Sequence, residues 1–121
     1  MTVADQQSPE MVAEIEKACR EVALMLGWEY HEKPIEHAGF EYHWSFNGRR
    51  RYDPEEYFLT PVGRDELERH LLEQGWEVIQ YVSSPRTTVT MSGRGRRQDR
   101  IGWGRTPAAA LVLVASQGQA G

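Results

Sequence analysis

The chain is short of cysteine, lysine and long apolar runs: its 121 residues include one cysteine, Cys19, and two lysines. A single thiol excludes an internal disulfide and is typical of a reducing compartment. The longest apolar run, Ala108–Ala115, has eight residues, fewer than the roughly 20 that a membrane-spanning helix needs. The N-terminus lacks the basic start and apolar core of a signal peptide. We therefore expect a cytoplasmic protein that does not enter a membrane.

Charge is unevenly distributed along the chain, although the net charge is only −4. Residues 1–48 carry nine acidic and three basic side chains, a net −6, whereas residues 86–105 carry six arginines against Asp99, a net +5. This asymmetry permits a local contact with an anionic partner without making the whole chain a nucleic-acid-binding protein.

A chain of 121 residues predicts one domain that buries enough surface to fold without a metal or a disulfide. We expect this domain to span residues 8–116, and residues 1–7 and 117–121 to be disordered ends. Cys19 falls within an apolar helical stripe, where a buried and inert thiol is expected.

The first predicted element is an amphipathic helix. Ser8-Pro9-Glu10 is a helix start, with a hydroxyl cap, a proline at the first position and a carboxylate near the positive end of the dipole. Apolar residues then recur every three or four positions: Met11, Ile15, Cys19, Val22 and Leu26. This spacing predicts about five helical turns. Gly27 ends the helix, and Trp28 can fold back over its last turn.

A β-hairpin is predicted next. Aromatic residues occupy every second position of Phe40–Phe46, which is the period of a half-buried strand. Asn47-Gly48 is the strongest short hairpin signal, and Arg49–Tyr52 would form the returning strand until Asp53-Pro54 stops it. The three arginines of that strand are typical of a solvated sheet edge.

The second half of the chain predicts a helix, two or three strands and a last helix. Thr60-Pro61 opens the first of these helices and Gly75 ends it. The segments Trp76–Val82 and Thr87–Ser92 are predicted to pair as strands, with Arg100–Trp103 as a short third strand. Thr106-Pro107 then caps a helix that is apolar on all sides and must be largely buried.

The predicted order is therefore a helix, a β-hairpin, a helix, two or three antiparallel strands and a helix. Helices that cover an antiparallel sheet define an α+β fold. We expect a single-domain layered sandwich in which three helices pack on an antiparallel sheet.

Three segments resemble the phage ABA-sandwich domain family, small proteins of phages and prophages. They are the helix end Glu21–Trp28, the stretch Tyr52–Val78 that runs into a helix, and the closing Gly104–Ser116, in which a Thr-Pro cap starts an alanine-rich helix. The resemblance implies a helix–sheet–helix layering and a phage origin. It implies no settled activity and no catalytic residues.

The segment Gly93–Arg105 contains five arginines, four glycines and one tryptophan. Arginines beside an indole could follow a phosphate backbone and stack on a base. An acidic protein surface is an equal target, and a solvated loop has the same composition. The predicted contact surface combines two clusters: Arg94, Arg96, Arg97, Arg100, Trp103 and Arg105 in this segment, and Arg49, Arg50 and Arg51 in the hairpin.

Other chemical motifs are incomplete. Gly104-Arg105-Thr106 lacks the lysine and the first glycine of a phosphate-binding loop. The histidines and glutamates of His31–His37 match no zinc-ligand spacing, and the proline among them predicts a solvated, irregular loop. Ser83 and Ser84 have no nucleophile elbow around them, and Cys19 lies in the middle of a helix. We therefore expect no metal, no cofactor and no enzymatic activity.

The sequence thus predicts a small phage or prophage accessory protein that acts by binding a host macromolecule, such as a defence or regulatory protein. The alternative is a nucleic-acid-binding module that uses the arginine-rich segment 93–105. The sequence leaves the identity of the partner and the oligomeric state open.

Overall fold

The computed structural model describes residues 9–37, 39–83, 86–93 and 99–117, and it confirms the α+β class. Four helices and six strands follow one another in this part of the chain. In chain order they are α2 (Pro9–Met25), β1 (Glu29–Ile35), β2 (Gly39–Phe46), β3 (Arg49–Arg51), α3 (Pro54–Tyr57), α4 (Pro61–Glu73), β4 (Trp76–Ser83), β5 (Arg86–Gly93), β6 (Arg100–Gly104) and α5 (Pro107–Ala115). No helix in the described ranges is long and apolar enough to cross a membrane.

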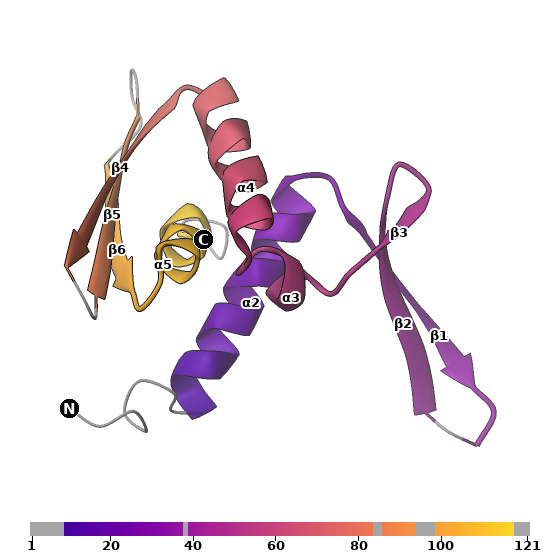
Figure 1. Ribbon diagram of the computed structural model, residues 1–121. Coiled ribbons are helices and arrows are strands. Elements are labelled where there is room, and N and C mark those ends of the chain that lie inside the picture. The colour runs from indigo at the N-terminus through magenta and orange to yellow at the C-terminus, as the bar shows by residue number, and fades with distance from the viewer. Residues whose placement is uncertain (1–8, 38, 84–85, 94–98, 118–121) are drawn as a thin grey trace.

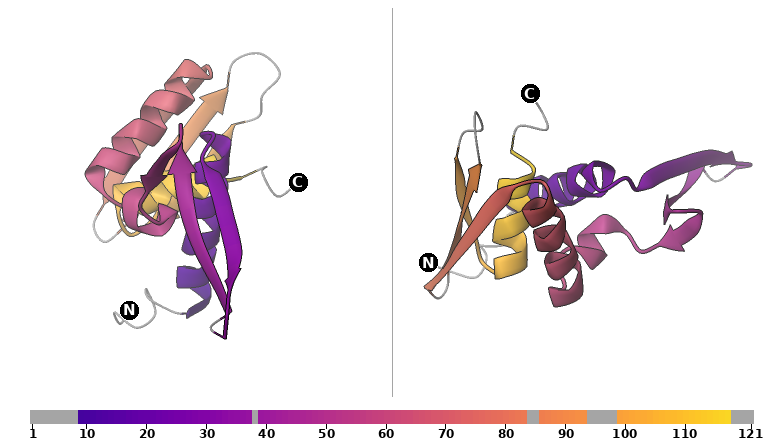
Figure 2. Two further views of the ribbon diagram at one scale, coloured as in Figure 1. Left: turned by 90° about the vertical axis from the view of Figure 1, so that its right-hand side faces the viewer. Right: turned by 90° about the horizontal axis from the view of Figure 1, so that it is seen from above.

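The strands form two separate antiparallel sheets, with the helices between them. Strands β1, β2 and β3 pair in that order in one sheet, and β4, β5 and β6 pair in that order in the other. In Figure 1 the β4–β6 sheet lies on the left, the helices lie in the centre and the β1–β3 sheet extends to the right. The view from above in Figure 2 shows the same separation. We call the β1–β3 sheet the arm, because it projects away from the helices.

The core lies between the β4–β6 sheet and the helices. The hydroxyl of Thr106 caps α5 by accepting a hydrogen bond from the Ala109 backbone nitrogen at 3.1 Å. Gly104 lets α5 approach β6 closely, because a Cβ there would lie 2.6 Å from the Ala110 nitrogen. Side chains of α5 and β5 are fully buried against one another: Val89, Met91, Leu111, Val112 and Val114. The predicted burial of the last helix is confirmed.

The prediction for His31–His37 is wrong, because most of this segment is a strand of the arm. An irregular loop was expected there, but β1 spans Glu29–Ile35 and pairs with β2 along its whole length. Pro34 fits because β1 is an edge strand, where one missing N–H donor is tolerated. All seven residues of β1 are exposed, so the strand is held by its pairing with β2.

The predicted hairpin at Asn47-Gly48 is confirmed. Both residues have positive φ, 52° and 79°, as a two-residue turn that matches the twist of its strands requires. The returning strand β3 is short and pairs with the last residues of β2. Its end at Asp53-Pro54 is also the start of α3, which the sequence analysis missed. Proline suits the first position of a helix, because its φ is fixed there and its missing N–H would be unpaired in any case.

The structure describes one residue of the predicted disordered tail. Gln117 is described, and its Nε2 donates a hydrogen bond to the Ile101 carbonyl oxygen at 3.0 Å. The other residues of the two predicted disordered ends lie outside the described residues.

Candidate functional site

The structure separates the two arginine clusters that the sequence predicts as one contact surface. Arg49–Arg51 lies in the arm, whereas Arg100–Arg105 belongs to β6 and its connection to α5. The arm and β6 are on opposite sides of the helices (Figures 1 and 2). Arg94, Arg96 and Arg97 lie outside the described residues.

One of the predicted contact residues, Arg100, connects β6 to β4 and α5. The Arg100 guanidinium lies 4.7 Å from the centre of the Trp76 ring, and its Nη1 donates to the Ala115 carbonyl at 3.2 Å. Arg100 therefore neutralises part of the negative end of α5. Arg105 is half-buried at the start of the same helix. Arg100 therefore has a role within the fold.

Trp103 is a predicted contact residue that is exposed. The strand register puts it on the outer face of the β4–β6 sheet, in a cross-strand row with Thr88 and Tyr81. The guanidinium of Arg86 lies 4.3 Å from the centre of its ring. A neighbouring row joins Ile79, Thr90 and Ile101.

These two rows carry four large apolar side chains, two on β4 and two on β6, with Thr88 and Thr90 of β5 between them, and we call this surface the outer face. Their exposed fractions are 44% for Ile79, 64% for Tyr81, 66% for Ile101 and 41% for Trp103. The described helices lie on the opposite side of this sheet (Figure 1). Sequence analysis did not identify Ile79, Tyr81 and Ile101 as contact residues. The alternation of exposed with less exposed positions along β4 and β6 is the pattern that could have indicated them.

The three hairpin arginines differ in their contacts: one packs against the fold, and the other two are exposed. Arg51 is half-buried: its guanidinium lies 4.6 Å from the Trp28 ring and 4.7 Å from the Tyr57 ring, and its Nη2 is 3.5 Å from a Glu66 oxygen. Arg49 and Arg50 are exposed and have no ion-pair partner among the described residues. With Tyr57 and other side chains they line a concavity of about 720 Å³.

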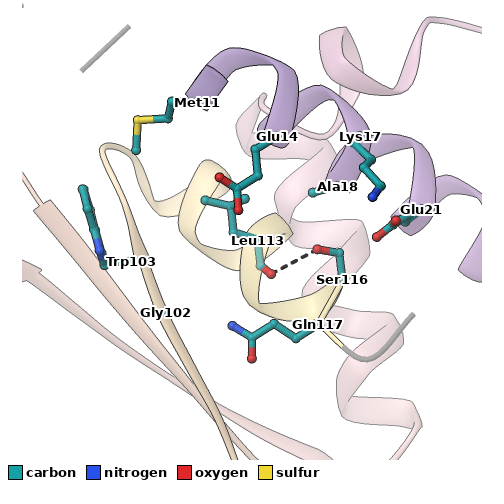
Figure 3. Close-up of a pocket in the computed structure, with 10 residues that line it drawn as sticks. All are labelled: Met11, Glu14, Lys17, Ala18, Glu21, Gly102, Trp103, Leu113, Ser116 and Gln117. Carbon is teal, nitrogen blue, oxygen red and sulfur yellow. Dashed lines mark hydrogen bonds between the residues drawn. The ribbon is translucent and has the colours of Figure 1, made fainter. Parts of the chain in front are cut away.

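A second concavity lies along the free edge of β6 (Figure 3). It has a volume of about 450 Å³ and runs between α2, α5 and β6. Its apolar lining comes from Met11, Ala18, Leu113 and Trp103, while Glu14, Lys17 and Glu21 line it from α2. We call it the edge groove.

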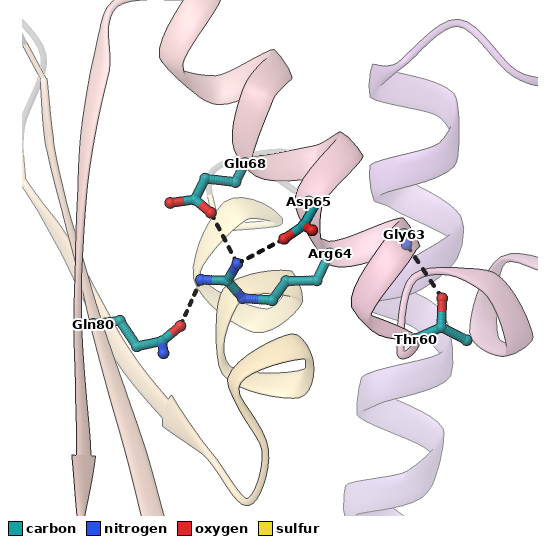
Figure 4. Close-up of polar contacts among 6 residues, drawn as sticks. All are labelled: Thr60, Gly63, Arg64, Asp65, Glu68 and Gln80. Atoms are coloured by element: carbon teal, nitrogen blue, oxygen red, sulfur yellow. Dashed lines mark hydrogen bonds and ion pairs between the residues drawn. The ribbon is translucent and has the colours of Figure 1, made fainter.

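The most enclosed charged cluster supports the fold. Arg64 of α4 donates hydrogen bonds to Glu68 at 2.8 Å, to Asp65 at 3.1 Å and to the Gln80 side-chain oxygen at 2.6 Å (Figure 4). Gln80 belongs to β4, so this cluster fastens α4 to the β4–β6 sheet. The same figure shows Thr60 capping α4, where its hydroxyl accepts a bond from the Gly63 nitrogen at 3.2 Å.

Among the remaining reactive side chains, the Cys19 thiol is buried, and His31 lies in the arm, where its Nε2 is 2.8 Å from the Ser45 hydroxyl. Burial, and then the charge of Glu55, raise the pKa of the Cys19 thiol to about 12. The thiol therefore stays protonated at neutral pH and is a poor nucleophile. His31 and His43 stack at 4.7 Å on the exposed arm, and the described residues bring no three metal-ligating side chains together.

Comparisons of the chain with protein-family models, with curated proteins and with solved structures found no match. The resemblance to the phage ABA-sandwich domain family therefore stays a prediction. The surfaces described above are the basis for assigning a function.

Proposed function

We propose that this chain is a non-enzymatic binding protein and that its outer face is the contact surface. The observation that carries the proposal is the pair of cross-strand rows on that face, where four large side chains of β4 and β6 are exposed on the two sides of two threonines of β5. A contiguous apolar patch on a protein surface marks a site of interaction, because leaving it in water costs free energy that a partner recovers. Tyrosine and tryptophan are also enriched in interfaces.

The partner that this chemistry favours is a protein. Ile79 and Ile101 supply aliphatic surface, which packs against apolar side chains and offers no stacking platform for a base. Arg86 covers part of Trp103 and leaves a positive charge at the rim of the patch. The resemblance to phage proteins supports a more specific form, a cytoplasmic phage or prophage accessory protein that binds a host defence or regulatory protein.

A comparison of two lysine substitutions tests the contact surface. Ile101→Lys places a charge on the outer face, and the control Val62→Lys places one on α4, where Val62 is exposed to nearly the same extent, 67% against 66%. Each tagged variant and the unmodified chain are incubated with host lysate. We expect a stoichiometric partner that the unmodified chain and Val62→Lys retain and that Ile101→Lys loses at least tenfold. A partner held equally by all three, or by none, would contradict the proposal.

A nucleic acid is the second candidate partner, and the two free hairpin arginines favour it. Arg49 and Arg50 share their concavity with Tyr52, which is 72% exposed and could stack on a base. Binding through phosphate contacts weakens steeply with salt because counterions compete. We expect that any salt-sensitive binding of single-stranded DNA is lost in Arg49→Glu/Arg50→Glu. Loss only in Arg94→Glu/Arg96→Glu/Arg97→Glu would instead assign it to the arginine-rich segment. Absence of binding by the unmodified chain at low salt excludes this candidate.

A further inference from the structure

We propose that the edge groove accepts an extended peptide segment of the partner, which pairs with β6 as a fourth strand of the β4–β6 sheet. The inference rests on the proposed function, because the added strand would continue the outer face. The partner would be recognised by backbone pairing along β6, and its side chains would lie alternately in the groove and on the outer face.

The backbone of β6 has an open edge within the described part of the chain. Strand β6 pairs with β5 on one side only. Gln117 donates to the Ile101 carbonyl, so this carbonyl points away from β5. In an antiparallel ladder, the N–H and C=O of one residue point to the same side and alternate along the strand. Ile101 and Trp103 therefore direct their backbone groups to the open edge, while Gly102 directs its groups to Val89 of β5.

Gln117 marks the position that a strand would take. Its side-chain amide satisfies the Ile101 carbonyl, as the backbone N–H of a neighbouring strand would do. Within the described residues, the Ile101 N–H and both backbone groups of Trp103 remain for a partner at this edge. A strand that displaces one side-chain amide can thus form up to four backbone hydrogen bonds, two to Ile101 and two to Trp103.

The edge groove decides which side chains the added strand should carry. Side chains on its inner side would meet Ala18 and Leu113, which favour small or apolar residues. Glu14 and Glu21 flank this surface, have no ion-pair partner among the described residues and outnumber Lys17 beside them. A basic side chain on the inner side would therefore be attracted. Side chains on the outer side would extend the row of Trp103 and should be apolar.

A second copy of this chain fits the edge less well. If β6 paired with another β6, the inner side of the added strand would consist of two glycines, Gly102 and Gly104, and Arg100. That arginine is already engaged with Trp76 and with the Ala115 carbonyl. Two copies of the α2 wall with Glu14 and Glu21 would also approach each other, which like charges oppose.

A pair of substitutions at one position isolates the backbone contact. Ile101→Pro and Ile101→Ala both remove the isoleucine side chain, but only the proline removes the N–H that points to the open edge. The chain is used to select binders from a displayed library of random twelve-residue peptides. We expect selected peptides to alternate apolar residues with small and basic ones, and to bind Ile101→Pro about tenfold or more weakly than they bind Ile101→Ala.

Charge reversal on α2 tests the groove itself. Glu14→Lys/Glu21→Lys should weaken the basic peptides about tenfold, whereas Glu32→Lys/Glu36→Lys makes the same change of net charge on the arm and should leave binding unchanged. Hydrogen exchange supplies a readout that needs no variant. In the free chain the Trp103 amide should exchange quickly and the Gly102 amide slowly, and a bound peptide should slow exchange at Trp103.

Other results would overturn the inference. Peptides that bind Ile101→Pro as well as Ile101→Ala, but fail to bind Tyr81→Lys, would keep the proposed outer-face contact and remove the added strand. Selection of no peptide, or a Trp103 amide that stays fast-exchanging when peptide is bound, removes it as well. A Trp103 amide that is slow in the free chain, together with a dimeric mass, would assign the edge to a second copy. If Ile101→Pro does not fold, the exchange of Trp103 in the unmodified chain decides.

Discussion

The arm and the β4–β6 sheet are both antiparallel sheets of three strands, and each has a central strand of eight residues. In β5, every second side chain from Thr87 to Met91 is fully buried. In β2, the aromatic residues at the same spacing are exposed at Phe40 and Tyr42 and buried only at Trp44. The difference arises because α5 returns onto β5 and β6, whereas the far half of the arm extends beyond the helices (Figure 1). An alternating pattern thus specifies a strand and one apolar face, and a second element must supply the cover.

Where no helix covers the arm, its aromatic side chains pack partly against one another. The Tyr30 ring lies 5.0 Å from Trp44 and 6.1 Å from Tyr42. At the base, Arg51 between Trp28 and Tyr57 attaches the sheet to the helical layer. We therefore expect the arm to open in local fluctuations that leave the β4–β6 sheet intact.

The largest expected contrast between the two sheets comes from truncating one side chain on each central strand. Met91→Ala removes a fully buried side chain from β5 and should lower the free energy of unfolding by about 2–5 kcal/mol. Tyr42→Ala on β2 removes a half-exposed side chain and should cost about 1 kcal/mol or less. Urea denaturation measures both. Equal losses would mean that the arm is buried as deeply as the β4–β6 sheet.

Two glycine substitutions test how closely α5 packs on the β4–β6 sheet, the sheet that it covers. A Cβ at Gly104 would meet the backbone of Ala110, which cannot move aside, and Gly104→Ala should cost about 1–3 kcal/mol. A Cβ at Gly102 would lie 2.8 Å from a methyl group of Val114, a side chain that can adjust, so Gly102→Ala should cost less. Thermal unfolding of the two variants gives the order. The reverse order would contradict close backbone packing at Gly104.

Arg51 provides a test of how the arm is attached. Arg51→Ala removes the stacked guanidinium and its ion pair with Glu66, and should destabilise the chain by about 1–2 kcal/mol. The matched variant Arg50→Ala alters an exposed neighbour on the same strand and should change stability by about 0.5 kcal/mol or less. Amide exchange of β1 and β2 should quicken only in Arg51→Ala. Quickening in both variants would remove the special role of Arg51.

The pH dependence of stability tests the burial of the Cys19 thiol in the helical layer between the two sheets. The pKa of Cys19 is about 12 in the folded chain and about 9 in the unfolded chain, so the unfolded state loses this proton first as pH rises. Stability from this group is complete below pH 9 and should fall between pH 9 and 12, by up to about 1.4 kcal/mol per pH unit. The difference between the unmodified chain and Cys19→Ala isolates this decline. A parallel pH dependence in the two chains would show that the thiol is not shielded.

Local sequence signals predicted most of the elements correctly. The caps at Thr60 and Thr106 and the turn at Asn47-Gly48 depend on a few adjacent residues, and all three are confirmed. Strand β1 was missed because Pro34 opposes a strand in general and is tolerated only at a sheet edge, a position that pairing defines.

The candidate site was predicted only in part, for the same reason. Trp103 was identified as a contact residue of the arginine-rich segment, and it is exposed. Its neighbours Ile79 and Tyr81 come from a different strand, and only the register of β4, β5 and β6 puts them beside it. Arginine content pointed to Arg49–Arg51 and to the β6 region alike, but composition carries no information on the distance between them.

The sequence by itself determined the α+β class, the capped helices and the alternation that forms each strand, because these follow from backbone preferences and from spacing within short segments. The tertiary structure alone decided that the strands divide into two sheets and that α5 buries one face of the second sheet. It also decided that the described part of the chain leaves the outer face and the edge of β6 open. These properties depend on contacts between segments far apart in the chain, where packing and register override any local preference.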